Sequence, residues 1–359
     1  MKLKLFGLIL AVAVLVAPGG RGRAQQEQFP FQIFERYLEP LVQQIGMPGL
    51  SAVILQNGSI AWSRSYGYAD VEQKIPTSID TPYAVGGVTQ AVTGVLVGVC
   101  IDRLQLDIDN DIRLFVPTFP VANTQIRQVL AHATDGRFQY NATNYQALTP
   151  VVAQCSKQSF RQAMATEVLD RLALQRSVPG LDLARSEGAA LREQFDPRMW
   201  DRYQSVLRDV AVPYRIDSKA RSSRSEYPSY GLDAASGLVS TAADLARFEG
   251  ELDRRSGTPL SFSTLDQMWS NATFSFSNGL TLTTPTGLGW FVTNESGQRL
   301  VWTFGHIPDA SSALIVKLPS KRLTLIMLAN SGGLAQGYNL ENASVTSSPF
   351  VKIFLRLFI

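Results

Sequence analysis

The segment Tyr83–Arg103 constrains the fold of this chain more than any other. It reads YAVGGVTQAVTGVLVGVCIDR, so a short apolar run enters the glycine pair Gly86-Gly87 and continues into small and β-branched residues. Apolar residues then recur at helical spacing, at Val88, Val92, Val95, Leu96 and Val99. The pattern predicts a strand-like entry, a tight turn and a buried helix.

The segments before this centre predict one helix and one hairpin. Phe31–Ile45 has the period of an amphipathic helix, in which Pro40 either kinks the helix or starts its second half. Gly49–Gln56 and Ser59–Tyr68 are predicted strands joined by Asn57-Gly58. An Asn-Gly pair supplies the positive φ angles of a two-residue type I′ turn, so these strands are expected to form a hairpin.

The C-terminal part predicts further strands and two helices. Ser240 or Thr241 can cap a helix that starts near Ala242. A hairpin turn is expected at Pro319–Arg322, and the polar segment Val178–Ser229 is expected to form irregular helical insertions. The remaining expected elements are three strands and a closing helix, at Leu300–His306, Ser312–Leu318, Leu323–Ala329 and Pro349–Ile359.

Several segments together resemble one known family. Gln125–Gly136 reads QIRQVLAHATDG where the family has I-R-x-L-L-x-H-T-S-G, and Gly231–Phe248 contains GLVSTAADLARF where it has G-G-x-x-S-T-A-x-D-L-A-R-F. On these motifs the chain resembles the β-lactamase-related serine hydrolases of the class C β-lactamase and penicillin-binding-protein superfamily. The resemblance covers about two-thirds of the mature chain.

This resemblance implies an α/β fold of the α+β kind. The expected architecture is β-lactamase/transpeptidase-like, with an antiparallel sheet flanked by helices and a mostly helical lobe. Within one domain at 25–359, we expect a sheet lobe at about 29–85 and 235–359 and a helical lobe at about 86–234.

The nucleophile motif of the family is degenerate here. Family members usually read F-x-I-G-S-x-x-K at the central helix, and this chain has Gly87 at the serine position and Gln90 at the lysine position. Residues three apart on a helix share a face, so the lysine amine of that motif can help to deprotonate the serine hydroxyl. Gly87 has no side chain, and the amide of Gln90 is not basic. The motif S-x-x-K occurs nowhere in the chain.

The second motif of the family, Y-x-N, aligns with Tyr140-Asn141-Ala142. Two roles for Tyr140 stay open, a phenolic proton shuttle or an aromatic ring packed on the helical lobe. The aligned asparagine is replaced by Ala142, for which Asn141 or Asn144 could substitute if the loop is shifted.

The third motif, H-x-G, aligns with His306-Ile307-Pro308. His306 is retained, but Pro308 replaces a glycine and has no N–H, so we expect a lost strand or ligand bond and a distorted strand. The only other histidine, His132, is expected by resemblance in a structural helix rather than in the cleft.

Other hydroxyl groups are poor substitutes for the lost nucleophile. Thr89 is two helical positions from Gly87 and faces away from the cleft. Thr93 lies deeper and is expected to bond to the backbone. Ser240 lacks the second glycine of a G-x-S-x-G elbow.

Composition argues against a metal centre and against nucleic-acid binding. Two histidines and two scattered cysteines disfavour a metal site, and no cofactor is expected. Asp107, Asp109 and Asp111 alternate like a calcium loop, but Ile112 and Thr118 stand where the loop needs glycine and glutamate, so we expect a solvated loop. A net charge of +3 without a basic run gives no nucleic-acid signal.

The N-terminus predicts export. Lys2 and Lys4 precede the apolar run Leu5–Ala17, and a small residue at Ala24 suits cleavage, so residues 1–24 are interpreted as a signal peptide and the protein as secreted or periplasmic. A retained anchor is the alternative, although the run is short for a membrane span and no later run is long enough.

The two cysteines, Cys100 and Cys155, leave two possibilities open. An oxidising compartment permits one bridge if they meet. Because Cys100 belongs to the buried helix, two unpaired core residues are the favoured interpretation.

The favoured interpretation of function is a secreted pseudoenzyme that keeps a cleft for a small-molecule or peptide-like ligand. A helix N-terminus can bind an anion, so the expected ligand-binding residues are Gly87, Val88, Gln90, Tyr140, Asn141 and His306. The alternatives are an active esterase or amidase with a relocated nucleophile and a structural or partner-binding protein.

Overall fold

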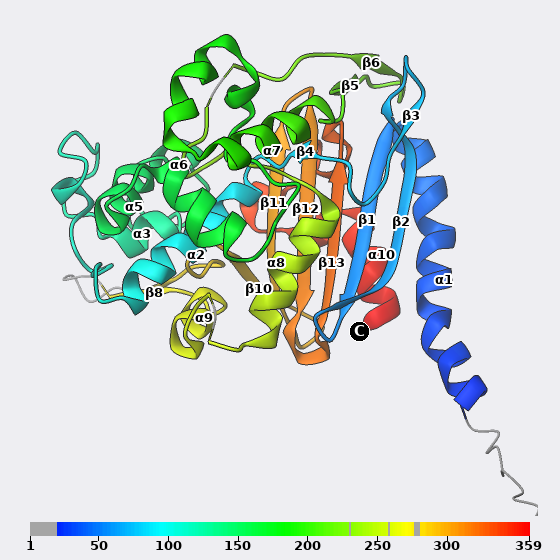
Figure 1. The fold of residues 1–359 in the computed structure, drawn as a ribbon. Coiled ribbons are helices and arrows are strands. Elements are labelled where there is room, and N and C mark those ends of the chain that lie inside the picture. The colour runs from blue at the N-terminus through cyan, green and yellow to red at the C-terminus, as the bar shows by residue number, and fades with distance from the viewer. Residues whose placement is uncertain (1–19, 230, 258, 276–280) are drawn as a thin grey trace, which may run out of the picture.

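The computed structural model describes residues 20–229, 231–257, 259–275 and 281–359 (Figure 1). Within them, an antiparallel sheet of seven strands has the order β10-β11-β12-β13-β1-β2-β3. Its strands are β1 (Gly49–Gln56), β2 (Ser59–Asp70), β3 (Ile75–Pro76), β10 (Phe291–Glu295), β11 (Gln298–Ile307), β12 (Ser311–Leu318) and β13 (Leu323–Ala329). Three short pairs lie outside it: β4 (Tyr83–Ala84) with β7 (Val239–Ser240), β5 (Tyr214–Ile216) with β6 (Ser222–Arg224), and β8 (Thr273–Ser275) with β9 (Thr281–Thr283).

Helices cover both faces of the sheet, and further helices form a layer on the α2 side (Figure 1). The described α-helices are α1 (Gly20–Ile45), α2 (Val88–Asp102), α3 (Ile126–Leu130), α4 (Ala142–Tyr145), α5 (Leu148–Ser156), α6 (Phe160–Ala163), α7 (Pro197–Arg208), α8 (Ala242–Arg254), α9 (Phe262–Met268) and α10 (Pro349–Phe358). The expected antiparallel sheet flanked by helices is therefore confirmed. The lobe boundaries near 86 and 234 stay a prediction.

The predicted hairpin and C-terminal strands are confirmed with small changes of boundary. Asn57 and Gly58 have φ angles of 55° and 75°, as the type I′ turn requires. Thr241 caps α8 by accepting a hydrogen bond from the backbone N–H of Asp244 at 3.0 Å. The helix α1 runs through both Pro30 and Pro40, and its start at Gly20 falls inside the expected leader, of which residues 1–19 lie outside the described part.

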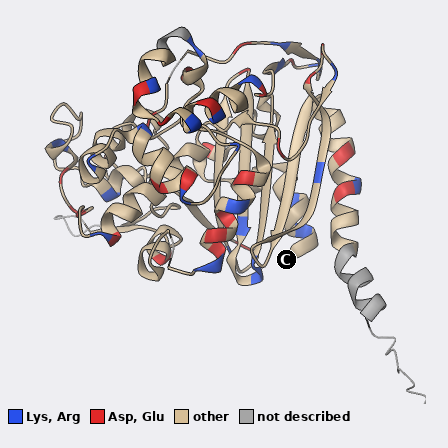
Figure 2. Cartoon of the chain, viewed as in Figure 1, with Lys and Arg blue, Asp and Glu red and all other residues tan. Residues whose placement is uncertain are grey.

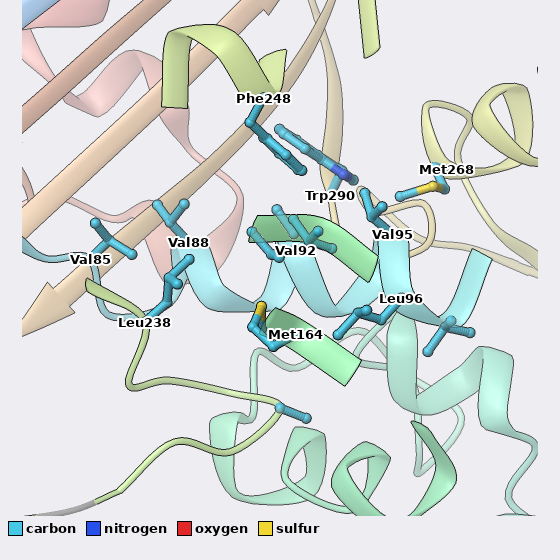
Figure 3. Packing of buried hydrophobic residues seen from close by; sticks show 14 of the residues in the cluster. Val85, Val88, Val92, Val95, Leu96, Met164, Leu238, Phe248, Met268 and Trp290 are labelled. Carbon is cyan, nitrogen blue, oxygen red and sulfur yellow. The ribbon is translucent and has the colours of Figure 1, made fainter. Parts of the chain in front are cut away.

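The two faces of the sheet have separate cores because strand side chains alternate. Trp302 and Phe304 of β11 pack with α1 and α10, whereas Val301 packs on the α2 side. On that side, α2 is almost wholly buried among Val85, Met164, Leu238, Phe248, Met268 and Trp290 (Figure 3). Charged residues lie mainly on helices and loops, and the central strands carry few (Figure 2). The burial of α2 confirms the buried helix that the apolar period of its sequence predicted.

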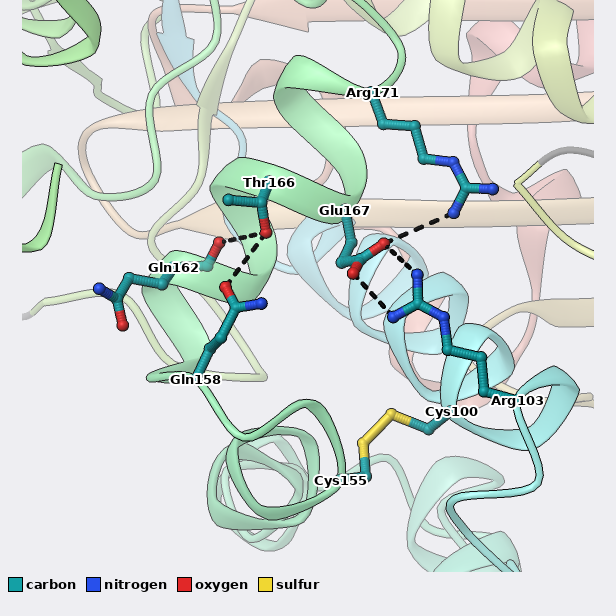
Figure 4. Close-up of polar contacts among 8 residues, drawn as sticks. All are labelled: Cys100, Arg103, Cys155, Gln158, Gln162, Thr166, Glu167 and Arg171. Carbon is teal, nitrogen blue, oxygen red and sulfur yellow. Dashed lines mark hydrogen bonds and ion pairs between the residues drawn. A yellow bond between two sulfur atoms is a disulfide. The ribbon is translucent and has the colours of Figure 1, made fainter. Parts of the chain in front are cut away.

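Cys100 and Cys155 form a disulfide that joins the end of α2 to α5, with 6.0 Å between their Cα atoms (Figure 4). The favoured interpretation of two unpaired core residues is therefore wrong. Both residues are buried as expected, but the helical packing brings them together from distant parts of the sequence. Arg103 and Glu167 pair beside the bridge at 2.7 Å.

Val178–Ser229 is more regular than predicted. It contains α7, where Asp196 accepts hydrogen bonds from two backbone N–H groups and Pro197 occupies the first turn. It also contains the short hairpin of β5 and β6. Irregular helical turns account for only part of the segment, at 181–184 and 186–194.

Candidate functional site

The candidate site begins where β4 leads into α2. β4 pairs with β7, and the N–H of Val85 donates to the carbonyl of Leu238 at 3.0 Å, which anchors the approach to the turn. Gly86 has a φ of 52°, a conformation that favours glycine, and Gly87 is the N-cap residue with helical φ and ψ. The predicted strand, turn and helix are confirmed.

The N–H groups at this helix start differ in availability. The N–H of Val88 donates to the carbonyl of Val85 at 3.2 Å, so it closes the turn instead of facing a ligand. Among the described residues, the N–H of Gly87 has no protein acceptor. Of the two backbone donors expected to bind an anion, only that of Gly87 is therefore free to do so.

Strand β11 lies directly against Gly87. A Cβ atom built on Gly87 would be 2.7 Å from the carbonyl oxygen of Phe304 and 3.0 Å from the hydroxyl of Tyr140. A Cβ on Gly305 would be 1.9 Å from the carbonyl oxygen of Val85. Both glycines are required by this close approach, and the place of a nucleophilic side chain is already filled.

Gln90 is held in a chain of hydrogen bonds. Its side chain is buried, its Nε2 donates to the hydroxyl of Tyr140 at 2.8 Å, and its Oε1 lies 3.1 Å from Nε2 of His132. The Tyr145 hydroxyl donates to the Gln90 carbonyl at 3.1 Å. Both ends of the amide are therefore satisfied by neutral groups where the family motif has a lysine.

His132 lies beside Gln90, so the expectation that it is remote from the site is wrong. The backbone N–H of Asn141 donates to its Nδ1 at 3.2 Å, which makes Nδ1 the acceptor and Nε2 the protonated nitrogen that donates to Gln90. Burial lowers the pKa of His132 from 6.5 to about 3, so the ring is neutral. It stacks on Tyr145 and packs against Tyr140.

No local sequence signal revealed this role of His132. The residue follows the end of α3 and has a φ of 52°, so its ring is aimed by a turn and not by the helix itself. Only the packing of α3 and α4 against α2 brings it to Gln90.

Tyr140 combines the two roles that the sequence left open. Its hydroxyl reaches Gly87 and Gln90, while its ring packs against Phe291 and Phe304 with centroids 6.1 and 5.4 Å away. Burial raises the pKa of Tyr140 to about 12, and the bond from Gln90 only partly offsets this. A phenolate is therefore scarce near neutral pH, and Tyr140 is a poor general base.

Asn141 and Asn144 have structural roles. The side chain of Asn141 caps α4 by accepting from the N–H of Asn144 at 2.8 Å. The side-chain amide of Asn144 donates to the hydroxyl of Thr134 at 3.0 Å. Neither amide contacts Gly87 or Gln90, so neither takes the place of the motif asparagine replaced by Ala142.

His306 is not brought together with Gln90 and His132. It pairs with Ser312 and follows Phe304 on the sheet face that packs with α1 and α10, opposite α2. Its Nε2 is buried without a protein partner, close to Gly332, and burial lowers its pKa. The β11 residue that faces the turn before α2 is Gly305.

The expectation that Pro308 distorts β11 is wrong. The ladder with β12 ends at Ile307, and the N–H of Ala310 donates to the carbonyl of Ile307 at 3.0 Å. Asp309 has a φ of 58°. Proline followed by a residue with positive φ is the pattern of a type II turn, so Pro308 starts the turn outside the ladder.

The alternative hydroxyl groups are engaged elsewhere, and the backbone bond expected of Thr93 is confirmed. Thr89 donates to the carbonyl of Gly86 at 2.7 Å, and Thr93 donates to that of Ala234 at 2.8 Å. Ser240 is fully buried and shares a hydrogen bond of 2.8 Å with Ser177, which in turn donates to Asp244. None of these hydroxyls is both exposed and next to a basic group.

The described residues offer neither a metal centre nor a membrane-spanning helix. No group of three or more histidine, cysteine, aspartate or glutamate side chains could hold a metal ion there. Within the same residues, no helix combines the length and apolar character needed to cross a bilayer.

Comparisons with known proteins agree with this architecture. A family model described as Beta-lactamase matches residues 34–347. Protein flp of Staphylococcus aureus strain MW2 is 21% identical over 341 residues, covering 83% of this chain and 63% of its own length, so the chain spans less than two-thirds of that relative. The mitochondrial serine beta-lactamase-like protein LACTB of Bos taurus is 29% identical over 83 residues, or 23% of this chain and 15% of its own.

Solved structures show the same fold. The octameric penicillin-binding protein homologue from Pyrococcus abyssi aligns with a TM-score of 0.69 at 20% identity, over 87% of this chain and 76% of its own. The penicillin binding protein from Bacillus halodurans aligns with a TM-score of 0.66 at 14% identity, over 89% and 98%. The family and the fold class expected from the sequence motifs are both confirmed.

Proposed function

The chain belongs to the Beta-lactamase family, and from this premise we propose that it is a family member that has lost acyl transfer. Covalent catalysis in this fold needs a hydroxyl at the start of the central helix and a base that removes its proton. Gly87 supplies no hydroxyl and Gln90 no base.

The observation that carries the proposal is the bonding of Gln90. A vacant site could recruit another base, but the Gln90 amide is bound on one side by the Nε2–H of His132 and on the other by the hydroxyl of Tyr140. Neither neighbour can act as the base at neutral pH: His132, with a pKa near 3, is too weakly basic, and Tyr140, with a pKa near 12, already carries its proton. A network of neutral groups replaces the charged dyad of the motif.

Steric contacts support the same proposal. The Phe304 carbonyl and the Tyr140 hydroxyl fill the space in which a side chain at position 87 would have to lie. Loss of both members of a catalytic pair costs on the order of 10⁶ in rate in a comparable hydrolase, about 8 kcal/mol of barrier. A single backbone donor at Gly87 does not recover that amount.

We also propose that the protein is exported and that residues 1–24 are removed as a signal peptide. The charged, apolar and small-residue order of the leader supports this, as does a disulfide between Cys100 and Cys155, because such bonds persist in oxidising compartments. The N-terminal mass of the mature protein tests it. An intact start at Met1 on most exported molecules refutes cleavage.

Covalent labelling tests the loss of acyl transfer. Intact-protein mass spectrometry after incubation with a penicillin, and separately with a nitrophenyl ester, is expected to show no acyl adduct, with an active serine β-lactamase as positive control. The Gly87→Ser/Gln90→Lys variant is also expected to stay unlabelled. An adduct on one hydroxyl of the wild-type site, together with turnover lost when that residue becomes alanine, identifies a relocated nucleophile and overturns the proposal.

A further inference from the structure

A cluster of three charged side chains lies buried between α8 and the sheet. Lys317 of β12 is 1% exposed, and its Nζ lies 2.6 Å from Oε2 of Glu249 and 2.7 Å from Oδ1 of Asp253. The ammonium also lies 4.9 Å from the ring centroid of Trp269, so this ring covers one side of the cluster. These groups are separate from Gln90 and its partners, so their behaviour does not depend on the proposed function.

The charges of this cluster do not balance when every group is ionised. One lysine faces two carboxylates, so full ionisation leaves one negative charge uncompensated in a largely buried place. An uncompensated buried charge costs several kcal/mol, and taking up one proton removes it. Among the described residues, no further cation pairs with these carboxylates, and Arg299 of β11 donates instead to the backbone carbonyl of Trp269 at 3.5 Å. β13 contributes the hydroxyl of Thr324, and the chain after α9 contributes the ring of Trp269.

The hydrogen bonds indicate which carboxylate takes the proton. Asp253 accepts from the hydroxyl of Thr324 at 3.2 Å as well as from Lys317, and its side chain keeps 9% exposure. Glu249 is fully buried, and its Oε1 has no protein partner. Asp253 is therefore the carboxylate that stays ionised, and Glu249 is the one that holds the proton.

We propose that Lys317, Glu249 and Asp253 form a proton-operated latch, which holds α8 to the sheet more tightly when Glu249 is protonated than when it is ionised. The helix packs over β1 and β13, so the latch secures the layer that covers the centre of the sheet. Its chemistry is the binding and release of a single proton.

The direction of the pH effect is set by the two states of Glu249. Burial and the neighbouring Asp253 raise its pKa from 4.5 to about 7, although Lys317 acts in the opposite direction. The resulting stabilisation is complete below pH 4.5 and is lost as pH rises through about 7. For Lys317, burial lowers the pKa, but the two carboxylates outweigh it and raise the pKa, so its own titration falls outside this range.

The size of the pH effect on stability follows from the same shift in the pKa of Glu249. Between pH 5 and pH 8, a group with these two pKa values raises the unfolding equilibrium constant by on the order of 50- to 100-fold. His132 and His306 have their pKa values shifted in the opposite direction, so the wild-type profile alone mixes several effects. The difference between the wild type and a variant of Glu249 isolates the latch.

Urea unfolding of the whole protein at pH 5, 6, 7 and 8 tests the proposal. We expect the unfolding constant of the wild type to rise relative to that of Glu249→Gln over this range, by on the order of 50- to 100-fold. Glu251→Gln is the matched control, because Glu251 lies on the same helix but pairs with Arg254 at the surface. The control is expected to follow the wild type. Parallel profiles for the wild type and Glu249→Gln overturn the proposal.

A second measurement does not depend on how well the variant folds. Carbon-13 NMR of wild-type protein labelled at the glutamate carboxyl carbons is expected to show one resonance, from the buried Glu249, that titrates near pH 7. Titration of every glutamate resonance below pH 5.5 means that Glu249 is ionised at neutral pH, and the latch then does not exist.

Discussion

Adding a single carbon at Gly87 is expected to destabilise the protein, although its backbone conformation suits any residue. Gly87 has a φ of −63° and a ψ of −11°, so alanine is not strained there. Replacing glycine under such conditions normally stabilises a protein by about 0.4–1 kcal/mol through the unfolded state. The surroundings reverse this expectation, because the new Cβ would lie 2.7 Å from the carbonyl oxygen of Phe304.

The expected net effect comes from weighing these two contributions. The Phe304 carbonyl belongs to β11 and can retreat only by moving a strand of the central sheet. Overpacking of this kind costs about 1–3 kcal/mol, which exceeds the entropic gain. Gly87→Ala should therefore lower the free energy of unfolding by about 1–2 kcal/mol. Gly87→Ser should lose at least as much, because its larger side chain would meet the same carbonyl oxygen and the Tyr140 hydroxyl.

Urea unfolding followed by fluorescence measures this change, and Gly98→Ala on the same helix is the control. A Cβ on Gly98 would meet only side-chain methyl groups, those of Leu260 at 2.8 Å and Thr264 at 3.0 Å, which can shift without moving a strand, and alanine is the better helix former. The control is expected to lose less stability than Gly87→Ala, because side-chain methyl groups give way more easily than a strand carbonyl. If Gly87→Ala unfolds at the same urea concentration as the wild type or a higher one, β11 does not press on the turn and the steric argument fails.

Three further predictions concern the groups around α2. Gln90→Lys should lower the free energy of unfolding by about 3 kcal/mol, because a buried ammonium would face the N–H of His132. Gln90→Met should lower it less, and the urea midpoints of the two variants test this. Burial lowers the pKa of His132 from 6.5 to about 3, so the neutral ring stabilises the fold fully above pH 6.5, and this contribution is lost as pH falls towards 3. Between pH 7 and pH 4, the free energy of unfolding of His132→Gln should therefore fall less than that of the wild type. Replacing Cys100 and Cys155 by alanine should cost about 2–4 kcal/mol in the same assay, and an unchanged midpoint would contradict a stabilising role for the bridge.

Local signals in the sequence were sufficient for most of the fold. The Asn57-Gly58 turn fixed a hairpin because few residues tolerate its backbone angles, and Thr241 marked the start of α8 because its hydroxyl satisfies a free N–H. The apolar period of Val88–Asp102 identified a central helix, since nothing but burial suits such a surface. Each of these conclusions depends on residues close together in the chain.

The candidate site was predicted less completely because it depends on contacts between distant segments. Gly87, Gln90 and Tyr140 do come together, but His132 enters through the packing of a turn that no local pattern announces. The side of the sheet on which His306 lies is decided by strand register, and a shift of one residue reverses it. A motif alignment carries no information on that register.

The pairing of β1 with β13 has a consequence for how this protein is made. Leu50 lies opposite Ala329, so two neighbouring central strands come from near the two ends of the sequence. The entropy lost on closing so long a loop is offset only after the strands have paired, and proteins rich in such distant pairings fold slowly. Until β13 has been synthesised, the edge of β1 that pairs with it has unpaired backbone N–H and C=O groups. Completion of the sheet is therefore expected only near the end of synthesis, so the unfinished chain exposes an aggregation-prone strand edge until then.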